Sequence, residues 1–319
     1  MINRSDDPAR TQQLLELRQA CTLCGNRCGV DRSDEESAGA CGAGALAEVS
    51  YYGPHLGEEP PISGTRGCGN IFFGHCNLSC VFCQNWQISQ NQQVTTQALG
   101  PVELADMMLR LQDDGVHTLG LVTPTPHLLT LVPALESARA RGLRLPVVYN
   151  TSAYETGAAL RLIDGLVDIY LPDMKFGTDS AARVYSGIPD YVDVSRAAVE
   201  EMHRQVGHLD LDEDGIARSG LLVRHLVLPG DRADTTVVLD WLARFFGPDL
   251  YLSLMSQYNP SHMVDQGFFP ELSSPLTPAD YQFAMDFALG LGLPNVFTQR
   301  EESRTTGNPD FCLRDPFKW

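Results

Sequence analysis

Positive charge is scarce in this chain of 319 residues: 23 Lys and Arg stand against 40 Asp and Glu, and the formal net charge is −17. Proteins that hold nucleic acid chiefly by its phosphates depend on clustered Lys and Arg. Here the basic residues are scattered, and their densest group, at 139–144, falls at the end of a predicted helix, where cations suit the helix dipole. The composition therefore argues against nucleic acid as the main partner.

Long apolar runs are missing as well. The first residues lack the apolar stretch of a signal peptide, and no later run approaches the length of a membrane span. We therefore expect a cytoplasmic protein without a membrane partner. Nine cysteines in that reducing compartment are better explained by metal binding than by disulfides, and their odd number agrees.

Three of the cysteines form a short loop motif, Cys76-x₃-Cys80-x₂-Cys83. Each thiolate of such a loop can hold one iron of a cubane cluster, which leaves the fourth iron open for chemistry. A structural zinc site would instead be closed by four ligands, usually from paired CxxC knuckles that this loop lacks, and its fourth ligand would have to be His75 or Cys312. Unligated core thiols are the other alternative, which the polar neighbours of these cysteines disfavour.

A second cysteine set lies upstream, in the Gly-rich pattern Cys21-x₂-Cys24-x₃-Cys28-x₁₂-Cys41. Four soft ligands can complete one tetrahedral zinc site or one whole cubane cluster. The segment has little apolar content, so metal binding would supply the free energy that orders it. Zinc, a cluster and unligated thiols all stay open here; a cluster would relay electrons, and zinc would form a structural lid or docking element.

Apolar and amphipathic runs alternate along the rest of the chain. Strands are predicted at 70–73, 118–122, 145–149, 167–171, 221–228 and 251–255, with a closing strand at 295–298. Helices are predicted at 102–112, 128–140, 155–164, 192–205 and 235–246, with a last helix from Pro278 to about 290–292 and a hairpin turn at 212–215. Repeated strand–helix units predict an α/β fold, a partial (β/α)₆ TIM-like barrel. We expect a Cys-rich, loop-like extension at 1–65, the barrel at 66–300 and a tail at 301–319.

The loops that follow parallel strands meet at one mouth of such a barrel. Polar motifs occupy these loops at 74–86, 123–127, 150–152, 172–175, 229–231 and 256–259. Each motif alone is compatible with an ordinary turn. Together they predict one site around the cysteine loop.

From about Cys21 to Arg300 the chain resembles the radical S-adenosylmethionine (SAM) superfamily, and within it the PflX-type branch related to pyruvate formate-lyase activating enzymes. The superfamily resemblance rests on the CxxxCxxC loop with Phe82 just before its third cysteine. The branch resemblance rests on LCGNRCGV at 23–30, GEEPPISGTRG at 57–67, IFF at 71–73, CQN at 83–85 and YLPDMK at 170–175.

The resemblance implies a [4Fe-4S] cluster whose open iron binds SAM. Reductive cleavage of SAM then gives methionine and a 5′-deoxyadenosyl radical that abstracts hydrogen. It also implies a low-potential electron donor such as flavodoxin or ferredoxin, and a glycyl radical enzyme as one protein substrate. Because no ferredoxin-like CxxCxxC motif follows Cys83, any accessory cluster would be the N-terminal one.

Carried over residue by residue, the resemblance makes Cys76, Cys80 and Cys83 the cluster ligands. Phe82 matches the aromatic residue whose backbone approaches the adenine of SAM. Lys175 matches a lysine that meets the SAM carboxylate, a charge-assisted contact that makes physical sense.

Other matches are partial. Thr123 and Thr125 stand where relatives have Gly-Gly-Glu, which receives the SAM amino group, so a Thr hydroxyl or a backbone carbonyl would have to replace that contact. Thr151 and Asp173 match residues around a monovalent cation site, but Asn150 replaces an Asp there.

Four further residues are singled out by position. Arg224 resembles an active-site arginine on the fifth strand, and we expect a carboxylate partner inside the barrel. His127 follows the second strand, where it faces the cavity, takes a hydroxyl-like role at a helix N-terminus or is exposed to solvent. His225 is predicted to be a packed core histidine. The role of Cys68 stays open between a spare thiol, a replacement ligand and a reactive group near the mouth.

The sequence is therefore compatible with three functions. The first is a radical SAM enzyme that activates a glycyl radical enzyme, and the second is radical modification of another peptide or a small metabolite. The third is a non-catalytic iron–sulfur or zinc protein for electron transfer or interaction, which the altered Gly-Gly-Glu position favours and Lys175 opposes. The aromatic chain end at 311–319 would close one barrel end or contact a partner.

Overall fold

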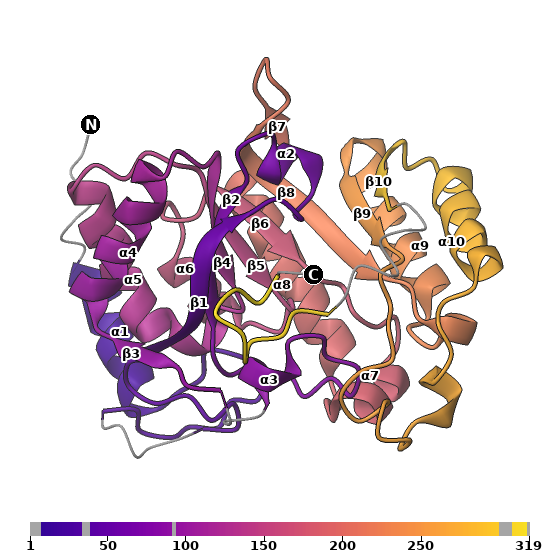
Figure 1. Cartoon of the computed structure of the whole chain (residues 1–319), viewed down its shortest axis with the longest axis horizontal. Coiled ribbons are helices and arrows are strands. Elements are labelled where there is room, and N and C mark those ends of the chain that lie inside the picture. The colour runs from indigo at the N-terminus through magenta and orange to yellow at the C-terminus, as the bar shows by residue number, and fades with distance from the viewer. Residues whose placement is uncertain (1–7, 34–38, 91–93, 300–307, 318–319) are drawn as a thin grey trace.

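The computed structural model, which describes residues 8–33, 39–90, 94–299 and 308–317, is built on one open sheet (Figure 1). Parallel neighbours run in the order β10-β9-β8-β6-β5-β4-β2. Their bounds are β2 (Cys68–Phe73), β4 (Thr118–Val122), β5 (Val147–Thr151), β6 (Ile169–Pro172), β8 (Ala217–Leu226), β9 (Tyr251–Met255) and β10 (Asn295–Thr298). The predicted α/β class with a mostly parallel, open sheet is confirmed.

Helices connect these strands and cover the sheet. They are α4 (Pro101–Asp113), α5 (Leu128–Ala140), α6 (Gly157–Leu162), α7 (Asp179–Ser186), α8 (Tyr191–Val206), α9 (Thr235–Phe246) and α10 (Pro278–Gly290). In α4 the buried residues Leu104, Met108 and Leu111 recur at helical spacing, which gives the helix one apolar face. The hydroxyl of Thr277 caps α10 by accepting from the amide of Asp280. The predictions for α5 and α9 match the observed bounds.

Four strands, β2, β5, β6 and β8, differ from their predicted bounds, and in β5 and β8 the neighbouring strands explain the difference. β5 starts after Pro146, which has no amide proton to donate, and continues through polar Asn150 and Thr151 because both pair with β6. β8 starts four residues before the predicted position 221, at Ala217, where it forms a hairpin with β7 (Asp210–Leu211). The predicted turn at 212–215 closes that hairpin, which projects from the molecule in Figure 1.

The N-terminal part of the chain joins the same sheet. β1 (Ala47–His55) pairs antiparallel with β2 on one side and with β3 (Gln97–Leu99) on the other, so residues on both sides of position 65 share one sheet. The remaining N-terminal elements are α1 (Pro8–Gln19), α2 (Pro60–Ser63) and α3 (Trp86–Ser89). The cysteines at 21–41 lie between α1 and β1 in loop structure, with a single bridge between Cys24 and Glu155.

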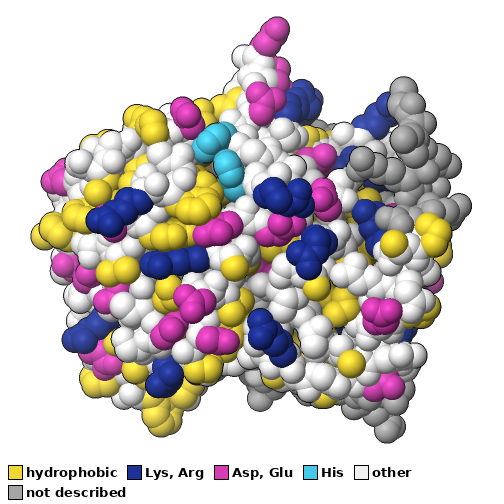
Figure 2. Space-filling view, turned by 180° about the vertical axis from the view of Figure 1, so that it is seen from behind, with side chains coloured by type: hydrophobic (Ala, Val, Ile, Leu, Met, Phe, Trp, Pro, Cys, Tyr) yellow, Lys and Arg dark blue, Asp and Glu magenta, His cyan; other side chains and the backbone are white. Residues whose placement is uncertain are grey.

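The charged side chains on the surface are distributed as the scattered basic residues of the sequence predict. Figure 2 shows the back of the molecule, where Lys and Arg side chains are interspersed with Asp and Glu over the helical face. Within the described ranges, every helix is too short or too polar to span a bilayer.

Candidate active site

The cysteine loop begins where β2 ends. Its backbone turns at His75, which has a positive φ of 64°, and the His75 amide donates to the carbonyl of Ile88 at 2.8 Å. The His75 ring is engaged by Glu48, whose Oε1 lies 2.9 Å from Nε2. Hydrogen bonds from His75 and Thr96 lower the pKa of Glu48 to about 2. His75 therefore stabilises the loop, and its Nε2 is occupied by the contact with Glu48.

The thiols of Cys76, Cys80 and Cys83 line one cavity of about 190 Å³. Cys80 Sγ lies 3.4 Å from Ser186 Oγ, and Cys83 Sγ lies 3.4 Å from Ser89 Oγ. Burial raises the pKa of the Cys76 and Cys80 thiols above their usual range. A metal that binds here must therefore displace their protons.

The set of ligands bears on the kind of metal. A structural zinc site is closed by four ligands, usually Cys and His. The described residues that line this cavity include three cysteines but no fourth cysteine and no histidine. Three thiolates can each hold one iron of a cubane and leave the fourth iron open, so the lining fits a cubane better than structural zinc.

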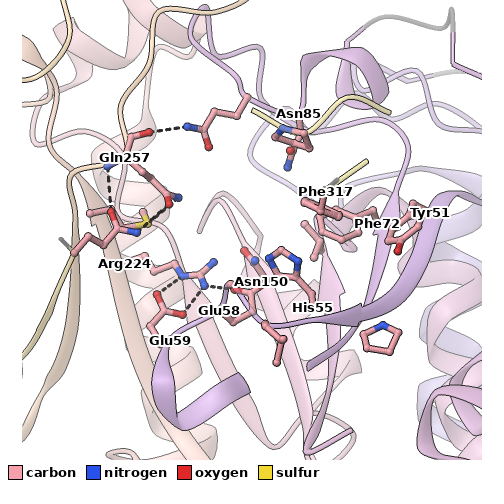
Figure 3. Close-up of a pocket in the computed structure, with 18 of the residues that line it drawn as sticks. Tyr51, His55, Glu58, Glu59, Phe72, Asn85, Asn150, Arg224, Gln257 and Phe317 are labelled. Carbon is pink, nitrogen blue, oxygen red and sulfur yellow. Dashed lines mark hydrogen bonds and ion pairs between the residues drawn. The ribbon is translucent and has the colours of Figure 1, made fainter. Parts of the chain in front are cut away.

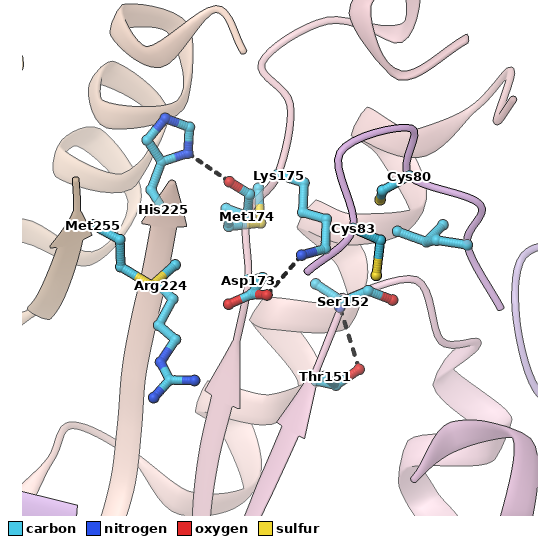
Figure 4. Close-up of polar contacts among 12 residues, drawn as sticks. Cys80, Cys83, Thr151, Ser152, Asp173, Met174, Lys175, Arg224, His225 and Met255 are labelled. Atoms are coloured by element: carbon cyan, nitrogen blue, oxygen red, sulfur yellow. Dashed lines mark hydrogen bonds and ion pairs between the residues drawn. The ribbon is translucent and has the colours of Figure 1, made fainter. Parts of the chain in front are cut away.

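A partly buried ion pair lies beside the thiols. Lys175 Nζ donates to Asp173 Oδ2 at 2.7 Å, and Figure 4 shows this lysine between Asp173 and the two labelled thiols, Cys80 and Cys83. Burial lowers the pKa of Lys175, but the Asp173 carboxylate and the Cys80 thiol outweigh it and hold the pKa above its usual range. Asp173 Oδ1 is buried with no hydrogen-bond partner among the described residues. The cavity thus contains a fixed cation and an unused acceptor.

Most of the residues predicted from the resemblance line this cavity. Phe82, Thr123, Asn150 and Thr151 do so together with the three cysteines, Asp173 and Lys175. Thr125 does not. It is buried, and its hydroxyl lies 3.1 Å from the Tyr149 hydroxyl and bonds to Glu155. Of the two threonines that replace Gly-Gly-Glu, only Thr123 therefore faces the cysteine cavity.

Glu155 is a buried carboxyl that sequence reasoning missed. Its Oε1 accepts from the hydroxyls of Thr125 and Thr151, and its Oε2 has no partner in the described structure. Burial raises the pKa of Glu155 in spite of these hydrogen bonds. Thr151 is only four residues away, but Thr125 lies 30 residues away in the loop after β4, and no local motif marks the pair.

A larger chamber of about 670 Å³ adjoins the cysteine cavity, with Asn150, Arg224 and Gln257 lining both. Figure 3 shows Arg224 at its wall beside Glu58 and Glu59. Arg224 Nε donates to Glu59 Oε1 at 2.7 Å, and Nη2 contacts Glu59 Oε2 at 2.5 Å and also Glu58. The carboxylate partner expected for Arg224 is confirmed, and it is supplied by the chain itself.

The position of Glu58 depends on two further residues. Asn70 Nδ2 donates to Glu58 Oε1 at 2.6 Å. Asn70 has room because its neighbour on β4 is Gly120: a Cβ there would lie 1.9 Å from Asn70 Oδ1. Glu58 and Glu59 belong to the GEEPPISGTRG stretch, where only the family resemblance had marked them.

The C-terminal residues 308–317 form another wall of the chamber. Phe311 and Phe317 pack on Phe72 of β2, with ring centroids 5.6 and 5.1 Å away. Gln87 donates to Asp310 Oδ1 at 3.0 Å and accepts from the Phe311 amide at 2.8 Å. The yellow segment in Figure 1 accordingly lies against the sheet beside β1. The rest of the predicted tail, apart from these residues, lies outside the described ranges.

The histidines and Cys68 lie outside the cavity. His127 is buried, with Nε2 2.8 Å from the Gly74 carbonyl, and burial lowers its pKa to about 4. It therefore faces neither the cysteine cavity nor solvent. His225 is a packed core histidine, as predicted, bonded to Met174 O at 2.6 Å and Thr235 Oγ1 at 3.0 Å. Cys68 is fully buried at the start of β2, away from the mouth.

The upstream cysteines come together elsewhere. Cys21, Cys24, Cys28 and Cys41 line one small cavity that also contains Arg32. Burial raises the pKa of Cys24 to about 12 and raises that of Cys41. The two cysteine sets therefore line two separate cavities.

Comparison with known proteins adds limited information. No family model matches the chain. An uncharacterized protein of Methanocaldococcus jannaschii, MJ0674, is 29% identical over 288 residues, covering 87% of this chain and 76% of that protein. Similarity at this level, to a protein without an assigned activity, brings no function to this chain.

Solved structures with a similar arrangement share little sequence. The FeFe-hydrogenase maturase HydG from Carboxydothermus hydrogenoformans has 16% identity and a TM-score of 0.47, over 71% of this chain and 52% of that one. Streptococcus suis SuiB bound to precursor peptide SuiA has 12% identity and a TM-score of 0.49, over 72% and 48%. Methylornithine synthase (PylB) has 15% and 0.45, over 74% and 69%. This chain spans about half the length of the first two, and function must be argued from the site.

Proposed function

We propose that this protein is a radical SAM enzyme. The observation that carries the proposal is one cavity, at the carboxyl ends of parallel strands, that holds three cysteine thiols and one lysine and opens into a larger chamber. A [4Fe-4S] cluster on Cys76, Cys80 and Cys83 would supply the electron that cleaves SAM to methionine and a 5′-deoxyadenosyl radical. The donor of that electron would be a low-potential protein such as a ferredoxin or flavodoxin.

The cavity residues have distinct tasks in this proposal. Lys175 meets the SAM carboxylate, and its backbone is fixed because the Lys175 amide donates to the Tyr191 hydroxyl at 2.9 Å. The unpartnered Oδ1 of Asp173 accepts a proton donor or contacts a monovalent cation, together with Thr151. Phe82, which is buried and at the cavity wall, contacts the adenine through its backbone. Thr123 is left to receive the SAM amino group.

The adjoining chamber is the place for the hydrogen donor. Its volume of about 670 Å³ falls within the range of ligand pockets, about 300–1,000 Å³. We propose a glycyl radical enzyme as the first candidate substrate, whose glycine-bearing loop would enter here, and another peptide or a small metabolite as the second. Anaerobic incubation with a candidate glycyl radical enzyme should generate a glycyl radical signal in electron paramagnetic resonance (EPR). SAM cleavage without that signal would favour the second candidate.

The SAM site is tested by adding SAM to the reconstituted, reduced protein and recording its EPR spectrum. SAM that chelates the open iron should change the cluster signal. An unchanged signal at saturating SAM would reject the site.

Replacing Lys175 by Ala should weaken SAM binding about 10- to 150-fold, because a hydrogen bond between charged groups contributes about 1.5–3 kcal/mol. Iron content should not change, since Lys175 is not a ligand. The measurement is equilibrium dialysis of SAM against the loaded protein. The chain has one other lysine, Lys318, and Lys318→Ala is the matched control. Equal SAM affinity in Lys175→Ala and wild type would remove Lys175 from the binding site.

A non-catalytic electron-transfer protein is the second candidate function. The observation that favours it is the orientation of Thr125, whose hydroxyl is occupied by Glu155 and Tyr149 and leaves Thr123 alone at the amino-group position. Such a protein would cycle electrons through its clusters and leave SAM intact.

A further inference from the structure

The N-terminal cysteine segment is packed directly against the cysteine loop. Asn26, between Cys24 and Cys28, donates from Nδ2 to the carbonyl of Asn77 at 2.8 Å. Asn77 lines the cavity of the upstream cysteines and is the chain neighbour of Cys76. One hydrogen bond therefore connects the loop of one cysteine set to the loop of the other.

A second contact region joins the same two sets. Cys41 and Cys76 both line a cavity of about 330 Å³ between the N-terminal segment and the cysteine loop. Asn77 is held on the barrel side as well, because its Nδ2 donates to the Tyr154 carbonyl at 3.1 Å. The two cysteine sets are thus adjacent, joined by the partly buried Asn26–Asn77 hydrogen bond and anchored to the barrel by the buried Asn77–Tyr154 hydrogen bond.

Arg32 indicates that the upstream centre carries negative charge. Its exposed fraction is 2%, its Nε and Nη2 donate to the Gly44 carbonyl at 3.1 and 2.5 Å, and Nη1 lies 3.9 Å from Cys21 Sγ. Among the residues that the structure describes, no carboxylate forms an ion pair with it. A buried cation needs a counter-charge. Neutral thiols supply none, whereas a metal with four thiolates has a net charge of about −2.

The position of the upstream thiols beside the cysteine loop favours a redox-active metal. Four thiols around a common cavity can each take one iron of a cubane. Zinc has no redox chemistry, so of the two metals that the sequence allows only a cubane can pass electrons to the cysteine loop.

Exposure of one cysteine bears on the direction of electron flow. Cys21 and Cys80 are buried, and Cys24, Cys41, Cys76 and Cys83 are partly buried, whereas Cys28 is exposed. An external protein can therefore reach the upstream set at the surface, through Cys28.

We infer that Cys21, Cys24, Cys28 and Cys41 hold a second [4Fe-4S] cluster that delivers electrons to the first across the Asn26–Asn77 contact. One electron from a reduced low-potential donor protein reduces the upstream cluster from 2+ to 1+, and its transfer reduces the downstream cluster likewise. The last step rests on the proposed function: the electron breaks the C5′–S bond of SAM, methionine leaves, and the downstream cluster returns to 2+.

Metal content and magnetic coupling test the second cluster without reference to activity. Three proteins are reconstituted anaerobically and reduced: wild type, Cys24→Ala/Cys41→Ala, and Cys76→Ala/Cys80→Ala. Wild type should contain about eight irons, and each variant about four. Because two adjacent reduced clusters interact magnetically, the wild-type EPR spectrum should be broadened, and each variant should give a simple single-cluster spectrum.

Cys312→Ala is the matched control, because Cys312 is exposed and belongs to neither set; it should keep the wild-type iron content and coupling. About one zinc with about four irons in wild type, or two clusters without coupling, would overturn the inference. Wild type with two coupled clusters that fails to cleave SAM would reject the proposed function and leave the second cluster in place.

Arg32 provides a separate test of charge. Arg32→Gln should make the midpoint potential of the upstream cluster more negative, because the buried cation no longer favours the reduced, more negative form. Arg32→Lys keeps the charge and should stay close to wild type. A redox titration followed by EPR, in the Cys76→Ala/Cys80→Ala background, reports the upstream cluster alone. Equal potentials in both variants would contradict the charge assigned to the centre.

Discussion

Cys80→Ala should remove about four irons per chain and abolish formation of 5′-deoxyadenosine. Cys80 is buried at the centre of the cysteine loop, lies beside Lys175 and contacts Ser186 through its sulfur. A cubane that loses one of only three protein ligands loses its fixed position and its single open iron. The measurements are iron and sulfide per chain after reconstitution, and product formation by liquid chromatography.

Two cysteines outside both sets serve as controls for this variant. Cys312→Ala changes an exposed thiol, and Cys68→Ala changes a fully buried one at the far end of β2. Both should retain the iron content and product formation of wild type. Undiminished SAM cleavage by Cys80→Ala would exclude Cys80 as a cluster ligand.

Arg224→Met should lower the free energy of unfolding by about 3–5 kcal/mol, the cost of removing one partner from a buried ion pair. Arg224 holds Glu58 and Glu59, and all three side chains are largely shielded from solvent. Without the guanidinium, two buried carboxylates face one another unpaired. Denaturant unfolding of the reconstituted protein measures the change.

A surface ion pair offers the matched control. Arg204 bonds to Glu201 and Asp164 on the exposed side of α8, where solvent screens the charges. Arg204→Met should leave the unfolding midpoint nearly unchanged. Similar midpoints for Arg224→Met and Arg204→Met would show that the buried pair does not stabilise the fold.

The pH dependence of this effect follows from Glu58. Burial raises the pKa of Glu58, but Arg224 outweighs it and the net pKa is lowered. Such a carboxyl stabilises the fold above its ordinary unfolded pKa, about 4.3, and this stability is lost as pH falls through the lowered folded value. In Arg224→Met, burial is opposed only by His55 and the Asn70 hydrogen bond, so Glu58 is protonated at higher pH. The stability gap between wild type and variant should therefore narrow on acidification.

Local patterns predicted the parts of this molecule that depend on near neighbours. The spacing of Cys76, Cys80 and Cys83 defines the loop, and apolar runs located β4 and β9 at their observed bounds. Five of the six polar motifs after parallel strands contribute residues to one cavity, as strand direction predicts, whereas the motif at 229–231 does not line it.

Features that depend on distant partners were not predictable. Glu59 is 165 residues from Arg224, and no spacing rule connects them. Thr125 turns away from the Cys76–Cys83 loop, toward the cavity of the upstream cysteines, because Thr123 has a positive φ of 58° and a short 3-10 helix, Thr125–His127, follows it. The role of Asn77 as the contact between the two cysteine sets likewise depends on tertiary packing.

The central claim is that this chain cleaves SAM. The direct measurement is mass-spectrometric quantification of 5′-deoxyadenosine and methionine after the reconstituted protein is reduced with dithionite under anaerobic conditions and supplied with SAM. The account predicts both products in equal amounts, dependent on reduction and absent in Cys80→Ala. Intact SAM in the presence of a fully loaded and reduced cluster would contradict it.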